Sequence, residues 1–361
     1  MIINNNVYRN VFLILCVIFI FNHNGLLSNG VLIHNDQFVI NSNNNNNNIK
    51  ANDNNRGITI SGISSGGFMA VQFHVAHSSI ISGAAIIAGG PYYCAMDNVY
   101  TALNACMVKP DEINIDQLIL DTTFAETSLT IDKTSNLENS KVWLYSGTKD
   151  TVVVQGVMEK LLEYYQHYIS DENIQTVFNI PSEHSFVTNG YGNQCDYLGP
   201  DYINNCNYSS AYEFLNYFYG PLNDPVSNAS DSNIISIDQT QYIPIGYTTI
   251  TAALNSLAYA YIPTACQNDR SLCSIHVAFH GCEQTVATIG NAFYTQTGYN
   301  EIAETNNLII LYPQALKTEL NPKGCWDWWG VTGPDYASQI GAQISTVHKM
   351  LLYLSNPSNK L

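Results

Sequence analysis

The chain has 361 residues, of which 46% are apolar and only 12% are charged. Its 13 basic and 29 acidic residues give a formal net charge of -16 at pH 7. The apolar content is enough for the core of one large α/β domain or two smaller ones. The acidic balance argues against binding nucleic acid or an anionic membrane through a broad basic surface. We therefore expect a monomer that binds no nucleic acid and has no stable membrane association.

The N-terminus is typical of a signal peptide. Arg9 precedes the apolar run 11–21, which is too short to cross a bilayer comfortably, and the chain becomes polar at Asn22. We predict a signal peptide over residues 1–25 that is cleaved between residues 24 and 30, with a signal anchor as the alternative. Residues 26–56 are rich in asparagine and predict a disordered leader. The mature protein is then secreted, or retained in the lumen of an acidic vesicle.

The cysteines agree with that location. Cys16 is removed with the signal peptide, and an even number in a secreted chain implies disulfides. Since no C-x-x-C spacing or Cys/His cluster exists, a metal site is a poor alternative, and we expect no metal. Two sequons, beginning at Asn207 and Asn228, predict N-glycosylation. Six cysteines form three pairs that are close in sequence and two remain, which gives Cys94 with Cys106, Cys195 with Cys206, Cys266 with Cys273, and Cys282 with Cys325.

The folded part begins near Gly57 with a strand that leads into a catalytic motif. Residues 62–66, Gly-Ile-Ser-Ser-Gly, fit the G-x-S-x-G pattern of a nucleophile elbow. β-Branched residues precede it over 58–60, an amphipathic helix is predicted after it, and a second strand is predicted over 84–88. The alternative is an ordinary Gly/Ser-rich turn. The flanks favour the elbow, with Ser64 as the nucleophile and the Ser65 N–H as an oxyanion donor.

Strands alternate with helices along the rest of the chain. This alternation, with apolar strand centres, predicts a doubly wound, mostly parallel sheet in a single α/β domain over 57–361. A polar, hinge-like region is predicted over 223–241. Predicted strands cover 141–147, 174–180, 257–262, 274–279 and 308–312, and predicted helices lie within 109–137, 157–169, 301–306 and 336–354.

Two residues after successive strands complete a candidate triad. A serine hydroxyl needs an imidazole to accept its proton and a carboxylate to orient that imidazole. Asp150 follows the strand 141–147, and His184 follows the strand 174–180, in the chain order of α/β-hydrolases. The alternatives are a helix N-cap for Asp150 and a surface loop histidine for His184. We predict that Ser64, His184 and Asp150 form the triad.

A second oxyanion donor is expected from another loop. The sequence His280-Gly281-Cys282 is similar to an H-G-type oxyanion loop, in which the Cys282 N–H is the donor. In most α/β-hydrolases this loop precedes the elbow, whereas here it follows the elbow by more than 200 residues. The simplest explanation is a circular permutation, since chain termini often lie close together at the surface.

These motifs together resemble the esterases of the poly(3-hydroxybutyrate) depolymerase family, in particular its single-domain, circularly permuted secreted members. The resemblance covers about residues 57–354. It rests on residues 62–70, 147–150, the His184 loop, Phe279-His280-Gly281-Cys282, Tyr312-Pro313-Gln314 and Cys325-Trp326-Asp327-Trp328.

The resemblance implies a secreted serine esterase with an α/β-hydrolase fold that hydrolyses poly- or oligo(3-hydroxyalkanoate) esters through an acyl-enzyme. It needs no cofactor. The resemblance also implies that a tryptophan lines the acyl-binding crevice, and Trp326, Trp328 and Trp329 suggest a partly exposed apolar wall there. The alternatives are a feruloyl or acetyl esterase acting on polysaccharide esters, and a non-catalytic binding protein on the hydrolase fold.

Overall fold

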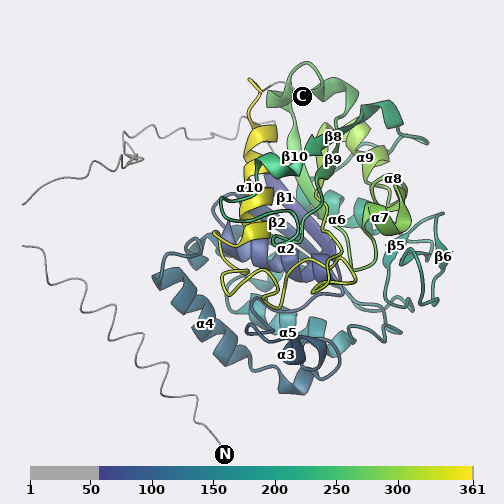
Figure 1. The fold of residues 1–361 in the computed structure, drawn as a ribbon. Coiled ribbons are helices and arrows are strands. Elements are labelled where there is room, and N and C mark those ends of the chain that lie inside the picture. The colour runs from purple at the N-terminus through teal and green to yellow at the C-terminus, as the bar shows by residue number, and fades with distance from the viewer. Residues whose placement is uncertain (1–56, 360–361) are drawn as a thin grey trace, which may run out of the picture. The chain divides into compact units, whose positions relative to one another are not determined.

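The strand that leads into the predicted elbow, β1 (Ile58–Ile63), lies near the middle of an eight-stranded sheet (Figure 1). The strand order across this sheet is β4-β3-β2-β1-β10-β11-β9-β8. The computed structural model describes residues 57–359, so the predicted signal peptide and leader lie outside the described residues. Within this described range, no helix is long and apolar enough to cross a membrane.

Six of the eight strands are parallel. The centres of five of them, all but the edge strand 174–177, are buried, which is why they read as apolar runs such as Leu-Ile-Ile-Leu-Tyr. The parallel strands other than β1 are β2 (Ile81–Ile87), β3 (Lys141–Tyr145), β4 (Ile174–Val177), β10 (Ser274–Phe279) and β11 (Leu308–Tyr312). At one edge, β9 (Leu257–Tyr261) is antiparallel to β11, and β8 (Ile234–Asp238) is antiparallel to β9.

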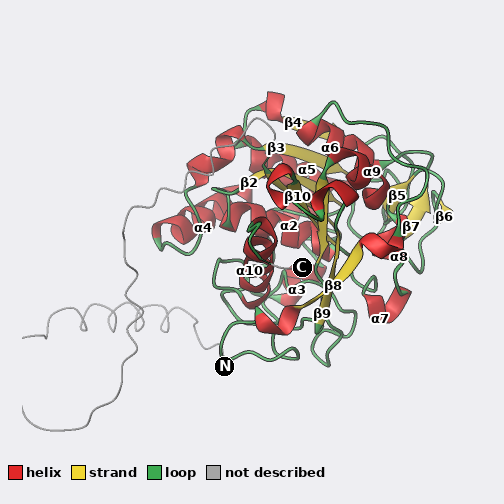
Figure 2. Ribbon diagram, turned by 90° about the horizontal axis from the view of Figure 1, so that it is seen from above, coloured by secondary structure: helices red, strands yellow, loops and turns green. Residues whose placement is uncertain are grey.

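Helices cover both faces of this sheet (Figure 2). One face carries α2 (Ser65–Ala76), which contacts α5 (Gln155–Gln166) through a His74–Tyr165 hydrogen bond and α10 (Ala342–Ser355) through stacked His77 and His348 rings. The other face carries α6 (Ser210–Tyr219) and α9 (Tyr299–Asn306). The predicted α/β class is confirmed. The remaining helices are α3 (Val99–Leu103), α4 (Ile115–Thr127), α7 (Val286–Ile289) and α8 (Ala292–Gln296).

The helix after the elbow differs from the prediction of an amphipathic helix. All twelve residues of α2 are buried, because the helix lies between the sheet and the α5 and α10 helices. Its polar side chains have partners inside the protein: Gln72 Nε2 donates to the Asp327 carbonyl at 2.9 Å, and His74 Nδ1 lies 3.0 Å from the Tyr165 hydroxyl.

Two other features differ from the sequence-based expectations. The predicted hinge over 223–241 contains the edge strand β8, so this part of the expectation is wrong. A second, three-stranded sheet, which was not predicted, has the order β5-β7-β6. Its strands are β5 (Phe186–Thr188), β6 (Asn193–Gln194) and β7 (Ile203–Asn205), and it begins two residues after His184.

All four predicted disulfides are present. They join Cys94 to Cys106, Cys195 to Cys206, Cys266 to Cys273 and Cys282 to Cys325. Close sequence spacing identified the first three pairs, and the remaining two cysteines are joined across 43 residues.

Candidate active site

The predicted catalytic residues lie in the chain after the parallel strands β1, β3 and β4 of the central sheet. From β1 the chain builds the sheet outward through β2, β3 and β4, whereas β10 and β11 lie on the opposite side of β1. The β1–β10 pair is therefore the topological switch point, where open α/β sheets bind ligands beyond the carboxyl ends of their strands. Ser64 directly follows β1, and His280 directly follows β10.

Ser64 has the backbone conformation of a nucleophile elbow. Its φ of 57° and ψ of -124° are unfavourable for a residue with a Cβ, and its N–H donates to the Ile87 carbonyl at 2.9 Å. The two motif glycines are required by close packing. A Cβ on Gly62 would lie 2.0 Å from the Gly66 carbonyl oxygen, and a Cβ on Gly66 would lie 2.4 Å from that of His280. The turn therefore presents a partly exposed Ser64 side chain beside the loop after β10.

Asp150 and His184 form a buried hydrogen-bonded pair. The Asp150 Oδ2 atom lies 2.8 Å from His184 Nδ1, and both side chains are almost fully buried. A carboxylate can only accept, so Nδ1 carries the proton and Nε2 is left as an acceptor. The other Asp150 oxygen accepts from the N–H groups of Val152 and Val153 at 2.9 and 2.8 Å. The structure joins these two residues by a direct hydrogen bond, and it places Ser64 after β1, beside the loop that follows β10.

The loops that carry the pair are bonded to each other. Glu183 links them, since its carboxylate accepts from the Thr151 N–H at 3.1 Å and from the His184 N–H at 2.9 Å. Beneath them, the hydroxyl groups of Tyr145 and Ser182 lie 2.7 Å apart. Each of these two loops thus fixes the position of the other.

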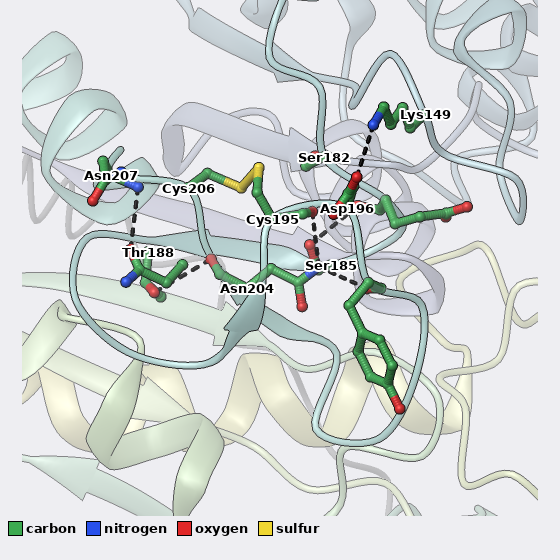
Figure 3. Close-up of a disulfide and its surroundings, with 12 residues drawn as sticks. Lys149, Ser182, Ser185, Thr188, Cys195, Asp196, Asn204, Cys206 and Asn207 are labelled. Carbon is green, nitrogen blue, oxygen red and sulfur yellow. Dashed lines mark hydrogen bonds and ion pairs between the residues drawn. A yellow bond between two sulfur atoms is a disulfide. The ribbon is translucent and has the colours of Figure 1, made fainter.

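A disulfide-bonded segment, residues 193–206, supports these loops (Figure 3). The Cys195 carbonyl accepts from the Glu183 N–H at 3.1 Å and also from Asn204 Nδ2 at 3.0 Å. The carboxylate of the adjacent Asp196 forms an ion pair with Lys149, the residue before Asp150, with 2.8 Å between Oδ2 and Nζ. The Cys195–Cys206 bridge therefore holds together the segment against which the His184 loop rests.

The oxyanion loop, residues 280–282, lies against the elbow. An ideal Cβ on Gly281 would be 3.4 Å from the Ser64 Cβ. The buried His280 ring holds this loop, because Nε2 accepts from the Ala315 N–H at 3.1 Å and Nδ1 lies 2.7 Å from the Gly281 carbonyl oxygen. Nδ1 therefore carries the proton and donates to that carbonyl. In a trans peptide the C=O and N–H point in opposite directions, so this bond turns the Cys282 N–H away from His280.

The pKa of the His280 ring supports the same assignment. Burial is the main cause that lowers this pKa to about 4, so the ring is neutral at pH 7. A neutral imidazole has one donor and one acceptor, which are the two functions that Gly281 and Ala315 require.

The three predicted tryptophans differ in exposure, and the expectation of a partly exposed wall is wrong for two of them. Trp326 is fully buried, since its ring packs against Phe279 and His280 behind the oxyanion loop. Trp328 is 6% exposed and stacks on Phe68 with ring centroids 4.0 Å apart. Only Trp329 is partly exposed.

Sequence patterns did not identify three polar residues that organise the site. Glu183 joins the two triad loops, as described above. Gln284 bonds the oxyanion loop to the chain at residues 201–202, and Asp327 accepts several backbone N–H groups of its own loop. Each of these side chains bonds to the backbone of a folded loop, so no spacing in the sequence marks it. The pattern Pro-Ser-Glu-His was the only local signal, since it places Glu183 beside the predicted base.

Two solved structures of PHB depolymerases resemble this fold closely. The crystal structure of PHB depolymerase from Penicillium funiculosum has a TM-score of 0.73 and 31% sequence identity, and the match covers 82% of this chain and 94% of that chain. A serine-to-alanine variant of a PHB depolymerase, complexed with an R3HB trimer, has a TM-score of 0.74 and 30% sequence identity. The match covers 85% of this chain and 97% of that chain.

Curated relatives agree with this structural match, although no protein-family model matches the chain. A poly(3-hydroxybutyrate) depolymerase from Delftia acidovorans is 39% identical over 297 residues, which are 81% of this chain but only 58% of that protein. A polyhydroxybutyrate depolymerase from Talaromyces funiculosus is 36% identical over 308 residues, 80% of this chain and 86% of the relative. Identity, coverage and fold together show that the chain belongs to the poly(3-hydroxybutyrate) depolymerase family.

Proposed function

We propose that this protein is a secreted serine esterase that hydrolyses poly- or oligo(3-hydroxyalkanoate) esters. The observation on which this proposal mainly rests is the buried Asp150–His184 pair. It is supported by the elbow conformation of Ser64 at the topological switch point. A binding protein would need neither the oriented imidazole nor the unfavourable backbone of Ser64. The relatives supply the substrate class, since one of them was solved with an R3HB trimer.

In the proposed reaction, His184 Nε2 removes the Ser64 hydroxyl proton while Oγ attacks the ester carbonyl carbon. The resulting tetrahedral intermediate collapses, His184 gives the proton to the leaving alkoxide, and an acyl-Ser64 ester and a free alcohol remain. Water then attacks the acyl-enzyme with His184 again as the base, which releases the acid and restores Ser64. Asp150 holds the imidazole in the required tautomer throughout.

The developing oxyanion is stabilised by two backbone donors, the N–H groups of Ser65 and Cys282. Ser65 is the first residue of α2, where backbone N–H groups have no partner within the helix. Its side-chain oxygen accepts from the Trp326 N–H at 3.2 Å, which ties the elbow to the tryptophan loop. The Cys282 N–H is directed by the bond between His280 and the Gly281 carbonyl. Donors fixed in advance stabilise the intermediate without reorganisation.

The tryptophan loop supplies the apolar contact for the acyl group. Trp329 is the exposed member, and Trp328 supports it through an edge-on ring contact at 5.9 Å between ring centroids. Trp326 lies behind both the loop and the oxyanion hole, so we assign it to the support of the site.

Secretion, glycosylation and the permuted chain order belong to the same proposal. Four disulfides are typical of an oxidising compartment, and both sequon asparagines, Asn207 and Asn228, have exposed side chains. The position of β1 at the middle of the sheet, near the start of the fold, supports a circular permutation. We expect a monomer that works without a cofactor.

The test is hydrolysis of 3-hydroxybutyrate trimer by the wild-type protein and by Ser64→Ala, with release of monomer and dimer followed by chromatography. We expect products only from the wild type. Cleavage of feruloyl or acetyl esters in place of the trimer, again dependent on Ser64, would assign the alternative esterase function. A wild type that turns over none of these esters contradicts the enzymatic proposal altogether.

A further inference from the structure

A buried glutamine joins the oxyanion loop to a distant part of the chain. Gln284 lies two residues after Cys282, is 1% exposed, and bonds only to the backbone through its side chain. Its Oε1 accepts from the Gly281 N–H at 2.6 Å. Its Nε2 donates to the carbonyl groups of Asp201 and Tyr202, at 2.8 and 3.1 Å. One carboxamide therefore satisfies three backbone groups in two loops.

At its first end, Gln284 completes the support of the oxyanion donor. The Gly281 N–H is held by Gln284, and the Gly281 C=O is held by His280. The peptide groups on both sides of the Gly281 Cα are thus fixed, and with them the direction of the Cys282 N–H. A Cβ on Gly281 would lie 2.9 Å from the Gln284 Oε1 atom, which shows how closely the carboxamide approaches this loop.

At its second end, Gln284 contacts the segment that supports the catalytic base. The Tyr202 carbonyl also accepts from the Phe186 N–H at 2.8 Å, and Phe186 lies two residues after His184. Asp201 and Tyr202 have φ values of 69° and 47°, and two successive left-handed residues that are not glycine are unfavourable. The bonds from Gln284 help to hold this strained turn, because they capture both of its carbonyl groups.

We propose that Gln284 is a positioning residue that fixes the oxyanion loop relative to the loop that carries His184. The nucleophile and one oxyanion donor belong to the elbow, whereas the base and the second donor come from two separate loops. Gln284 is the side chain that bonds to both supports, the Gly281 peptide and the Tyr202 carbonyl. This role rests on the proposed esterase function. Because the oxyanion donor stabilises charge that develops in the transition state, the loss of Gln284 should affect kcat more than substrate binding.

The test compares the wild type with Gln284→Met, which retains most of the side-chain volume and removes all three bonds. We expect kcat on p-nitrophenyl butyrate to fall about 10- to 100-fold, because small errors in positioning cost rate, while KM changes less than about threefold. The affinity for phenylboronic acid, which forms a tetrahedral adduct with an active serine, should fall by the same factor as kcat. Gln284→Glu keeps the acceptor for Gly281 and replaces the donors, and we expect a loss of about tenfold.

The matched control is Asn306→Leu. Asn306 is also buried and has a similar bonding pattern, since Oδ1 accepts from the Asn223 N–H and Nδ2 donates to the Asn223 and Ile302 carbonyls and to the Thr305 hydroxyl. It lies at the end of α9, and its loss should lower Tm but leave kcat and boronate affinity unchanged. If Gln284→Met does not fold, Gln284→Glu is measured in the same way.

The proposal is overturned if an active wild type and the folded Gln284 variants share the same kcat and boronate affinity. It is equally overturned if the variants lose activity only through KM, or if Asn306→Leu loses boronate affinity to the same extent. An inactive wild type would instead contradict the proposed esterase function, so the two failures are distinguishable.

Discussion

Asp150 performs two tasks with its two carboxylate oxygens. One oxygen binds the His184 ring, and the other accepts the N–H groups of Val152 and Val153 in the turn that follows. The N-cap of α5 is Val154, so Asp150 stabilises the turn before that helix rather than the helix itself. These backbone bonds lock the carboxylate in place, which is what an orienting residue in a triad requires.

At this scale we predict that Asp150→Asn lowers kcat on p-nitrophenyl butyrate by about 10⁴-fold with little change in KM. The amide has nearly the shape of the carboxylate, but its NH₂ group is a donor. Facing the His184 ring, it favours the tautomer in which Nδ1 accepts and Nε2 carries the proton, so that Nε2 cannot act as the base. The control is Asp269→Asn, whose carboxylate caps a similar turn through Ser271 before β10, at the opposite edge of the sheet. The control should retain wild-type kcat, and a fully active Asp150→Asn would rule out the triad.

At the scale of elements, the tryptophan loop is organised around one buried carboxylate. Asp327 Oδ1 accepts from the N–H groups of Trp329, Gly330 and Val331 at 3.2, 2.8 and 3.0 Å. Its Oδ2 accepts from the N–H and the hydroxyl of Thr332 at 2.8 and 2.7 Å. Five donors around one carboxylate give the loop a single conformation, and this conformation sets the position of the Trp329 ring.

We therefore predict that Asp327→Asn destabilises the protein by about 2 kcal/mol, because an amide group must face N–H donors that it cannot accept from. The KM for 3-hydroxybutyrate trimer should rise as the Trp329 position is lost. Urea unfolding and initial rates measure the two effects. Asp335→Asn, an exposed position nearby in the chain, is the control that should change neither. Unchanged trimer kinetics in a destabilised Asp327→Asn would contradict a role of this loop in substrate binding.

The Cys282–Cys325 disulfide joins the oxyanion loop to the tryptophan loop. Removing both of its cysteines, as Cys282→Ser with Cys325→Ser, should lower the free energy of unfolding by about 4 kcal/mol, because the bridge closes a long loop. It should also reduce kcat, since the oxyanion donor loses a support. The matched pair Cys266→Ser with Cys273→Ser closes a loop of only seven residues before β10, so about 2 kcal/mol and no change in kcat are expected. Equal kcat values in the two double variants would contradict this account.

At the scale of the whole molecule, a buried polar network connects the two strands of the switch point. His276 on β10 lies 2.7 Å from the hydroxyl oxygens of both Thr59 and Ser61 on β1. These hydroxyls in turn contact Tyr219 on α6 and Tyr299 on α9, at 2.8 and 2.6 Å. Both strands lead directly into catalytic loops, so the network fixes the relative position of the elbow and the oxyanion loop from below.

The network has a consequence for acid stability. Burial lowers the pKa of His276 to about 3, whereas an unfolded chain binds this proton near pH 6.5. The unfolded state therefore binds more protons below pH 6.5, and stability falls as the pH drops from there toward 3. We predict that His276→Gln is less stable than the wild type at pH 7 but loses less stability as the pH falls. Between roughly pH 6 and 4, the slope of its unfolding free energy against pH should be smaller than that of the wild type by about 1.4 kcal/mol per pH unit. Urea unfolding across this range is the measurement, and parallel curves would contradict the prediction.

Much of this arrangement could be predicted because its signals are local. The elbow motif, the buried strands over 141–145, 274–279 and 308–312, and the close cysteine pairs all depend on residues near one another in sequence. The edge strand β8 was missed because three isoleucines stand within a stretch of Asn, Asp and Ser, and an edge strand needs little apolar content. The strands of the small sheet are too short to show a period.

What could not be predicted depends on tertiary contacts. Gln284, Glu183 and Asp327 act through bonds to the backbone of folded loops, and the sequence does not show which backbone groups each of them bonds. The predicted exposure of Trp326 and Trp328 was wrong for the same reason, since their burial depends on tertiary contacts. Trp326 is buried because Phe279 and His280 pack on it from the strand end of β10, almost fifty residues earlier.

The proposed reaction requires that Ser64 becomes acylated. The most direct measurement is rapid acid quenching of the protein during turnover of 3-hydroxybutyrate trimer, followed by mass spectrometry of the proteolytic peptides. We predict an added hydroxybutyryl-containing acyl group on the peptide with Ser64 and its absence in Ser64→Ala. In a His184→Ala variant that is acylated with an activated p-nitrophenyl ester, the acyl group should accumulate, because the base for its hydrolysis is missing. Turnover with an acyl group on another residue, or turnover that persists in Ser64→Ala, would contradict the proposed reaction.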